Sequence, residues 1–416
     1  MGNYLHSPLT IQSSVLNFVV LSVFTLALIT FFFLFPEKKE SGRLWRATIT
    51  PLASIIGSGY LVSAPLLYYT LGIHAIFGML GIVVLAYLVG SAIRYNILFA
   101  EPIIYGGAKS EREVLLKEVE SLSNLVISLA YMISTAFYLR LLSAFIFSGF
   151  FGRHPVYENL LTSAVLLFIG ITGYLRGLSF LEFLEKYAVS LKLSVISAFL
   201  TGLFLYDLHH THIVGEAKPF TFGALQLLAG ILLIVQGFET SKYLGEEYTP
   251  EERVKSMKLA QLISGGIYLA TILLLTPILH NLSLDRVDET AIIALAAGVC
   301  VALGYLMKLG PLMSQFSAAV ADTIGAGGLI REETHGRISS NTGYLFTAFM
   351  GIVLVWSTNI FHIITYASKA FALYYLLQTL IALFVAAERR DIGRVGLFVL
   401  IALALAFVVL FGKSAE

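Results

Sequence analysis

The feature that most constrains this chain is a pair of apolar segments, each long enough to cross a bilayer and each interrupted near its middle. The first, residues 49–70, contains Gly57-Ser58-Gly59, and the second, residues 222–245, contains Gln236-Gly237-Phe238-Glu239. Backbone that leaves its helix inside hydrocarbon is tolerated only where it lines a cavity or is buried in protein. Interrupted spans at corresponding places in two halves of a chain are typical of a secondary transporter's binding site. The two interruptions therefore predict one shared central site.

The composition places the chain in a membrane. Hydrophobic residues make up 57% of the 416 residues and charged residues 13%, whereas soluble proteins average about 25% charged residues. The apolar runs are continuous over about 20 residues, which favours spanning helices over the alternating strands of a barrel. The net charge of +1 argues against nucleic acid as a partner. The single cysteine, Cys300, excludes an intramolecular disulfide and a cysteine metal cluster.

Run length predicts an all-α polytopic membrane protein of about twelve transmembrane helices. An extra N-terminal helix at residues 13–35 precedes eleven core helices, and residues 285–295 are expected to form an external loop or a short surface helix. The core helices are expected at residues 49–70, 73–100, 121–149, 158–175, 182–206, 222–245, 257–280, 298–325, 342–357, 359–387 and 393–412.

Core helices 1–5 and 6–10 form two sets of five. Because five is odd, the second set enters the membrane from the opposite side, as an inverted repeat requires, and each interruption lies in the first helix of its set. We therefore divide the chain into four parts. Residues 1–48 are the extra helix and a cytoplasmic linker, 49–206 the first repeat, 207–387 the second repeat, and 388–416 a final transmembrane helix with the C-terminal tail.

Charge asymmetry predicts the orientation. If residues 37–48 are cytoplasmic, the inner segments hold most of the 27 Lys and Arg residues, and the outer segments hold only Arg153, Lys218, Arg286 and Lys413. Positive residues accumulate on the cytoplasmic side of membrane proteins. We expect an integral protein of the plasma (cytoplasmic) membrane with both termini external.

At this point the residues resemble the amino acid–polyamine–organocation (APC) superfamily, whose members share the leucine-transporter fold of five-plus-five inverted repeats. Ser54 to Gly59 looks like the isoleucine-glycine-x-glycine motif of the family's first helix. Gln236 to Thr240, followed by Glu246-Glu247, Pro250 and Arg253, is similar to its sixth-helix pattern. Ala100-Glu101 followed by Gly106-Gly107 resembles the end of its second helix, and Leu191-Lys192-Leu193 the lysine-leucine step of its fifth. The extra N-terminal helix and Gln236 depart from the family pattern.

The resemblance implies where a substrate is held. In the family, amides at the first-helix break hold the substrate carboxylate, and carbonyls at the sixth-helix break hold its ammonium. The corresponding residues here are Gly57, Ser58 and Gly59, and Gln236, Gly237 and Phe238. The free N–H groups and the positive dipole of a helix start suit an anionic group. Close packing of helices through small residues is the alternative explanation for either break alone.

Lys192 lies near the middle of core helix 5, where an ammonium is costly unless it is paired, hydrated or neutral. In proton-coupled members a fifth-helix lysine stands where sodium sits in sodium-coupled ones, and we expect Lys192 to couple transport to protons. A structural cation bonded to helix 1 carbonyls is the alternative. Ser314 and Ser317 share one face of core helix 8 and would complete a sodium site, a weaker alternative, since such hydroxyls usually bond backbone within their own helix.

Other polar and aromatic residues give weaker indications. A carboxylate such as Glu239 at the bilayer midplane is a candidate for substrate contact or for orienting the unwound segment. Tyr131 and Phe238 are the preferred pocket aromatics, ahead of Phe137 and Tyr138. Arg94, Arg140, Lys308, Asp322 and Lys369 are expected to be buried pairs or snorkelling side chains near span ends, and His209, His210 and His212 to lie in a solvated outer loop.

The sequence carries no His-Glu-x-x-His, Gly-x-Ser-x-Gly or phosphate-loop motif, so we expect no enzymatic activity, no catalytic residue, no bound metal and no cofactor. We predict a secondary active transporter of a small organic solute, an amino acid or related amine, driven by protons rather than sodium. The alternatives are an inorganic cation transporter on the same fold and a non-transporting membrane sensor. We predict neither the individual substrate nor the oligomeric state from the sequence.

Overall fold

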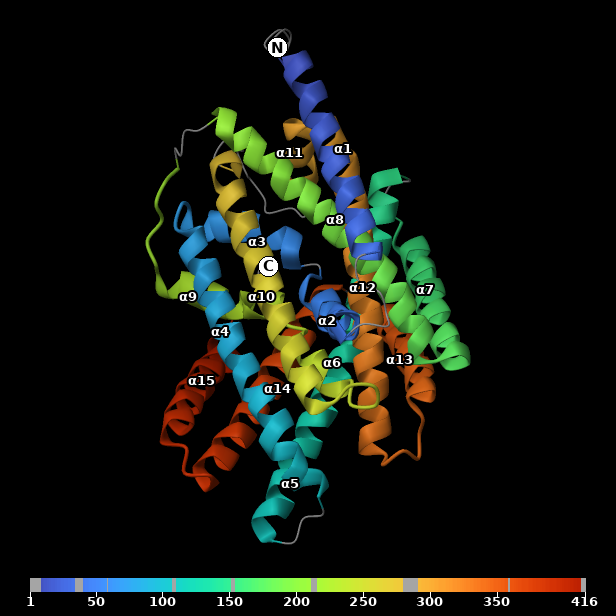
Figure 1. The fold of residues 1–416 in the computed structure, drawn as a ribbon, viewed down its shortest axis with the longest axis vertical. Helices are drawn as coiled ribbons and strands as arrows, with labels where there is room; N and C mark the ends of the chain where they lie inside the picture. Colours follow the sequence, from blue (N-terminus) through green and yellow to red (C-terminus); the bar gives the residue numbers. More distant parts are fainter. Residues whose placement is uncertain are drawn as a thin grey trace.

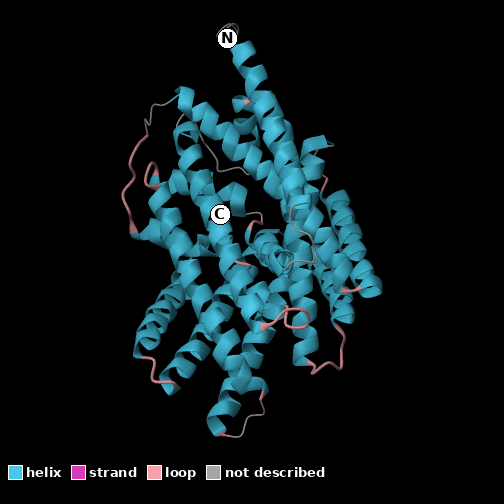
Figure 2. Ribbon diagram, viewed as in Figure 1, coloured by secondary structure: helices cyan, strands magenta, loops and turns pink. Residues whose placement is uncertain are grey.

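The computed structural model of the protein describes residues 9–33, 40–57, 59–106, 110–150, 154–210, 215–279, 291–357 and 360–412. Within these ranges the chain consists of helices and connecting loops (Figure 2). One isolated β-bridge joins Gly72 and Ala217. The predicted all-α class is confirmed. Predicted residues outside these ranges include Ser58 and His212.

The first half of the chain follows the predicted order of spans. The extra helix is α1 (Leu9–Phe33), and core helix 1 is divided into α2 (Glu40–Ile55) and α3 (Gly59–Leu71). Core helix 2 comprises α4 (Ala75–Tyr95), a π-helical turn η1 (Asn96–Ala100) and α5 (Glu101–Tyr105). Core helices 3, 4 and 5 are α6 (Glu111–Phe150), α7 (Pro155–Arg176) and α8 (Leu178–His210).

The second half repeats this pattern. Core helix 6 comprises α9 (Phe222–Ile231) and two 3₁₀ segments, η2 (Leu232–Val235) and η3 (Phe238–Tyr243), so its second half is not α-helical. The remaining helices are α10 (Pro250–Leu279), α11 (Ala291–Val299), α12 (Val301–Glu333), α13 (Ser340–Ser357), α14 (Ile360–Glu388) and α15 (Ile392–Phe411).

The long helices α6 and α12 pack against each other in the centre of the protein, and α7 packs against α13 beside them. The helix α1 lies along α8, and α15 lies along α14 (Figure 1). We call the end of the molecule that carries α5 and the loops at residues 334–339 and 389–391 the α5 end (Figure 1, bottom). The divided core helix 1 is thus surrounded by α8, α10 and α12.

Eight helices of the described residues are long and apolar enough to cross a membrane. The divided spans do not qualify, because the breaks cut their apolar runs into short pieces. Nor do α12 and α13, which bury polar side chains such as Ser314, Gln315 and Thr347 against other helices. Hydropathy of single helices therefore undercounts the spans of this fold.

Two predicted helix boundaries are wrong. The helix α6 begins at Glu111 rather than near residue 121, and α12 continues to Glu333 rather than ending near residue 325. Two cations on either side of the loop between η3 and α10, Lys242 and Arg253, are only 3% and 6% exposed. The two cations are buried because each is ion-paired with a glutamate of another helix, Glu120 and Glu101 respectively.

Small residues set the spacing of α12 and α13. A Cβ built on Gly327 would lie 2.1 Å from the Tyr344 ring, so the two helices approach too closely for any side chain there. Replacing Gly327 with alanine should destabilise the protein by ~1–3 kcal/mol, the usual cost of overpacking. Thermal unfolding of the purified protein in detergent measures the effect.

The matched control is Gly266→Ala in α10, where an added Cβ has no atom within 4 Å. An unchanged melting temperature for Gly327→Ala would contradict the described contact between α12 and α13.

Candidate functional site

The two helix breaks lie directly against each other. At the second break, Gly237 has a φ of +109°, in the left-handed region that other residues rarely adopt. A Cβ built on Gly237 would lie 2.3 Å from the Ser54 hydroxyl, in the last turn of α2. Glycine is therefore required at position 237 both by its backbone conformation and by the close approach of helix 1.

The first break releases backbone carbonyls, because the last turn of any helix leaves them without an intrahelical partner. Side chains from three other helices bond these carbonyls. The Lys192 ammonium of α8 donates to the oxygens of Ala53 and Ile56, at 3.0 and 2.8 Å. The Ser314 hydroxyl of α12 lies 2.7 Å from the oxygen of Ile56 and 3.0 Å from that of Gly57.

Tyr268 of α10 connects the two breaks. Its hydroxyl lies 3.1 Å from the carbonyl oxygen of Ile55, the last residue of α2, and 3.0 Å from that of Ile234, just before the second break. The ring is fully buried. A single hydroxyl thus serves unpaired carbonyls from both interrupted helices.

Lys192 is 1% exposed, and its third bond goes to the Ser317 hydroxyl at 2.9 Å. All three ammonium protons therefore have an acceptor, and none of the three acceptors is a carboxylate. The structure brings Lys192, Ser314 and Ser317 together around the first break. The Lys192 ammonium therefore occupies the position at which Ser314 and Ser317 would complete a sodium site.

Glu239 stabilises the second break by accepting hydrogen bonds from three protein groups. Its carboxylate accepts from the Tyr375 hydroxyl at 2.6 Å, from the Gly237 amide at 2.9 Å and, more weakly, from the Tyr131 hydroxyl at 3.3 Å. The Phe238 ring stacks on Tyr375, with centroids 5.2 Å apart. Of the two roles considered for Glu239, orienting the unwound segment is the one that these contacts describe.

Of the two environments expected for Asp322, a buried pair or a snorkelling side chain near a span end, the structure shows a buried one, although its partners are hydroxyls and not a cation. It is fully buried within α12, where it accepts from the hydroxyls of Ser54, at 2.8 Å, and Ser134. It thereby joins helix 1, one turn before the break, to α6. The sequence shows that Asp322 lies inside an apolar run, but only the structure shows which residues it contacts.

The other intramembrane charges have separate environments. Arg94 donates to the Gln261 amide and lies over the Tyr87 ring, and Arg140 pairs with Glu158. Lys308 lies over the Tyr305 ring, 5.7 Å from its centroid, and Lys369 is exposed. These four residues do not contribute to the breaks. The side chains of His209 and His210 lie outside the described part of the structure.

Three buried side chains from the second break, α6 and α12 hold polar atoms that make no hydrogen bond within the described structure: the Gln236 carbonyl oxygen, the Thr135 hydroxyl and both polar atoms of the Gln315 amide. Gln236 belongs to the second break, Gln315 follows Ser314, and Thr135 follows Ser134. Buried polar groups are nearly always paired with protein or water. Of these atoms, the Gln236 oxygen is the one that lies in a break. The sequence predicted only Gln236.

Tyr138 adds an aromatic side to this region. A Cβ built on Gly57 would lie 3.4 Å from its ring and 3.5 Å from its hydroxyl. Tyr131, in contrast, packs against Gly325 of α12 and bonds Glu239. Tyr138 therefore lies against the first break. The sequence analysis preferred Tyr131 and Phe238 to it as pocket aromatics.

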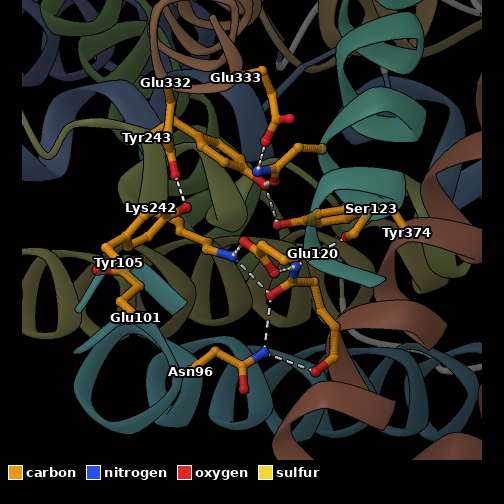
Figure 3. A network of polar contacts seen from close by, with 12 residues as sticks. Asn96, Glu101, Tyr105, Glu120, Ser123, Lys242, Tyr243, Glu332, Glu333 and Tyr374 are labelled. Carbon is orange, nitrogen blue, oxygen red and sulfur yellow. Dashed lines mark hydrogen bonds and ion pairs between the residues drawn. The ribbon is translucent and has the colours of Figure 1, made fainter. Parts of the chain in front are cut away.

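A second polar network holds η3 at the α5 end of helix 6 (Figure 3). The Lys242 ammonium pairs with Glu120 of α6 and donates to the Gln378 side-chain oxygen of α14 at 3.0 Å. The Gln378 amide also donates to Glu120 and Ser123, at 2.8 and 2.9 Å. Asn96 of η1 donates to the same Gln378 oxygen at 2.9 Å. Four separate elements are thus joined around Gln378.

An open cavity of about 530 Å³ adjoins this network at the α5 end. Its lining includes Lys242 and Tyr243, which follow the second break, and Arg253, whose guanidinium forms a two-bond pair with Glu101 at 3.0 and 2.7 Å. The cavity therefore reaches the part of helix 6 that lies beyond the break.

Sequence comparison relates the chain to a transporter family. The family described as "APC superfamily transporter" matches residues 37–412. An uncharacterized protein of Aquifex aeolicus (strain VF5) is 62% identical over 400 residues, which cover 96% of this chain and 98% of that protein.

Solved transporters share the fold at low sequence identity. A mutant of the Eremococcus coleocola manganese transporter has a TM-score of 0.60 at 13% identity, covering 89% of this chain and 87% of its own. A Na⁺-coupled sialic acid symporter in a substrate-bound, outward-open state has a TM-score of 0.54 at 11% identity, covering 96% and 99%. At these identities the likeness establishes the fold of polytopic transporters and nothing about substrate.

The bridge made by Tyr268 gives a testable expectation. Tyr268→Phe removes one hydroxyl and leaves a buried carbonyl at each break without that donor, so we expect a loss of ~1–3 kcal/mol in stability. Thermal unfolding in detergent measures it. Tyr305→Phe is the control, since Tyr305 is 68% exposed. Equal melting temperatures for the two variants would contradict the bridging role.

Proposed function

The chain belongs to the APC superfamily of transporters, and from this membership we propose that it carries an amino acid or related amine across the cytoplasmic membrane, driven by protons. Its fold and family are those of membrane transporters and not of an enzyme. The observation that carries the proposal is the contact between the two breaks, where Gly237 lies against Ser54. A solute held there lies between two interrupted helices, as alternating access requires.

The chemistry of the breaks fits a small solute with both an anionic and a cationic group. The start of α3 at Gly59 presents N–H groups and a positive dipole end to a carboxylate. The Gln236 oxygen, which has no partner among the described residues, suits an ammonium donor. The amide of Gln315 and the hydroxyls of Thr135 and Tyr138 supply further polar contacts for the rest of the solute.

Lys192 supports protons over sodium as the coupling ion. Its ammonium is bonded to two helix 1 carbonyls and to Ser317, which are the oxygens a sodium ion would need. A fixed cation and a sodium ion repel each other at this spacing. A lysine that releases its proton during the cycle would weaken these three bonds and so couple proton release to movement of helix 1.

We propose the orientation that the positive-inside rule gives, with the α5 end in the cytoplasm and both termini outside. In this orientation the 530 Å³ cavity at the α5 end is the cytoplasmic approach to helix 6. The bundle that moves would include the divided helices, and α6, α7, α12 and α13 would form the scaffold.

An inorganic cation transporter is the second candidate, favoured by the fold shared with a manganese transporter. Against it, the described residues hold no group of three or more His, Cys, Asp or Glu side chains that could bind a metal ion. The carboxylates nearest the breaks, Glu239 and Asp322, are already bonded to hydroxyls.

A thermal-shift screen of the purified protein against amino acids, polyamines, nucleobases and Mn²⁺ identifies the ligand class, since a ligand that binds only the folded state raises the melting temperature. We expect a rise with an amino acid or amine. A rise with Mn²⁺ alone would select the second candidate, and binding without flux in proteoliposomes would select a sensor.

Coupling is tested with Lys192→Met in proteoliposomes that carry a pH gradient. We expect accumulation of the screened ligand driven by the pH gradient to fall at least tenfold, because the variant has no proton to exchange at this site. Lys308→Met is the control, since Lys308 is exposed on α12. Gradient-driven accumulation equal to wild type would refute the role of Lys192.

A further inference from the structure

The facing surfaces of α2 and α8 carry a polar stripe that the sequence analysis did not identify. On α8, Glu182, Glu185 and Lys192 are three and seven residues apart, which places them on one helical face. On α2, Arg46 and Thr50 follow the same periodicity. The stripe runs from the α5 end of the two helices to the first break.

Each polar group of α8 in this stripe meets a group of α2. The Glu182 carboxylate lies 3.8 Å from the Arg46 guanidinium. The Glu185 carboxylate accepts from the Thr50 hydroxyl at 2.6 Å. The Lys192 ammonium bonds the carbonyls of the last turn of α2 and of the break. The helix 1 segment before the break is therefore held to α8 along its length by polar contacts.

Glu185 is the exceptional member of the stripe. It is fully buried and forms no ion pair within the described structure. One oxygen accepts from Thr50, and the other accepts no hydrogen bond from the described residues. A buried carboxylate without a cationic partner is strongly disfavoured, whereas a carboxylic acid is tolerated. The unpartnered oxygen is therefore a place where a proton can be held.

The charged groups around Glu185 come from few elements. Glu182 and Lys192 lie on its own helix, Asp322 on α12, and Arg46 on α2 beside Glu182. The helix α1, which also packs on α8, has no charged residue between Leu9 and Phe33. Lys192 is thus the cation of the stripe that is buried together with Glu185.

Exposure increases along the stripe toward the α5 end. Lys192 and Glu185 are 1% and 0% exposed, whereas the side chains of Glu182 and Arg46 are 11% and 38% exposed. Lys192 therefore has no direct access to water at that end, and Glu185 lies between it and the surface.

We propose that Glu185 relays protons between Lys192 and the aqueous phase at the α5 end. The inference rests on the proposed proton coupling. The Glu185 carboxylic acid first gives its proton to water beside Glu182. The carboxylate so formed takes a proton from the Lys192 ammonium, which leaves a neutral amine and restores the neutral carboxylic acid. The amine regains a proton from the opposite side of the membrane, so one proton crosses in each cycle.

The helix geometry suits this transfer. Side chains on an α-helix lean toward its N-terminus, so Lys192 leans toward Glu185. Seven residues span roughly 10 Å along a helix axis, so the proposed transfer requires a water molecule between the two side chains. Loss of the charge on Lys192 weakens its bonds to Ala53, Ile56 and Ser317 at the same moment.

The test uses Glu185→Gln, which keeps an acceptor for Thr50 but cannot carry a proton, in full-length protein reconstituted in proteoliposomes. The probe is the amino acid or amine that gives the largest thermal shift. Two measurements separate the roles: substrate counterflow at equal pH on both sides, which needs no net proton movement, and uptake driven by a pH gradient with a dye reporting internal pH.

We expect Glu185→Gln to retain counterflow within threefold of wild type and to lose at least tenfold in gradient-driven uptake and proton flux. Glu185→Asp, which restores a titratable group, should recover part of both. Gradient-driven uptake equal to wild type for Glu185→Gln would overturn the relay. Equal losses of counterflow and gradient-driven uptake in both variants would assign Glu185 a structural role and overturn it as well. If wild type itself transports without proton flux, the proposed coupling fails, and the relay fails with it.

Discussion

The structure depends on how the carbonyls released at the first helix break are satisfied. An unpaired carbonyl in hydrocarbon costs several kcal/mol by general estimate, and the break releases a group of them between Ala53 and Gly57. Lys192, Tyr268 and Ser314, from three different helices, donate to these oxygens. The break can therefore exist only while α8, α10 and α12 surround it. The hydrogen bonds from these donors can also be broken, because a lysine can lose its proton and a hydroxyl can rotate. The segment is therefore fixed in this structure but able to move.

The second break is stabilised differently, by a carboxylate of its own segment. Its carboxylate, Glu239, comes from the break itself and accepts from Gly237 within the same segment. Beyond it, η3 is fixed by the buried pair of Lys242 and Glu120 and by the hydrogen bonds of Gln378 (Figure 3). This network joins η1 and η3, parts of the divided or distorted helices, to the long helices α6 and α14. Movement of helix 6 must either carry this network with it or break it, and an open cavity adjoins the network.

Much of this was predictable because it depends on local sequence. Apolar run length predicted the number and order of spans, and Gly57 and Gly237 marked the breaks. At Gly237 the close approach of Ser54 and the left-handed backbone require glycine. Lys192 was found because a cation in mid-span is rare. The partners were not predictable. Asp322 bonds Ser54, 268 residues away, and Tyr268 bonds Ile55, 213 residues away. The burial of Lys242 and Arg253 was equally unpredictable, because a solvated cation and a buried, paired one look alike in sequence until the glutamate of another helix is placed beside them.

The central claim is that the two breaks enclose one solute. It is tested most directly by an electron cryo-microscopy structure of the protein in lipid nanodiscs with the ligand identified by thermal shift. The account predicts ligand density in contact with both the Gly57–Gly59 break and the Gln236–Phe238 break, with Lys192 against the carbonyls of helix 1. Continuous helices at these positions, or ligand density bound elsewhere with both breaks unoccupied, would contradict it.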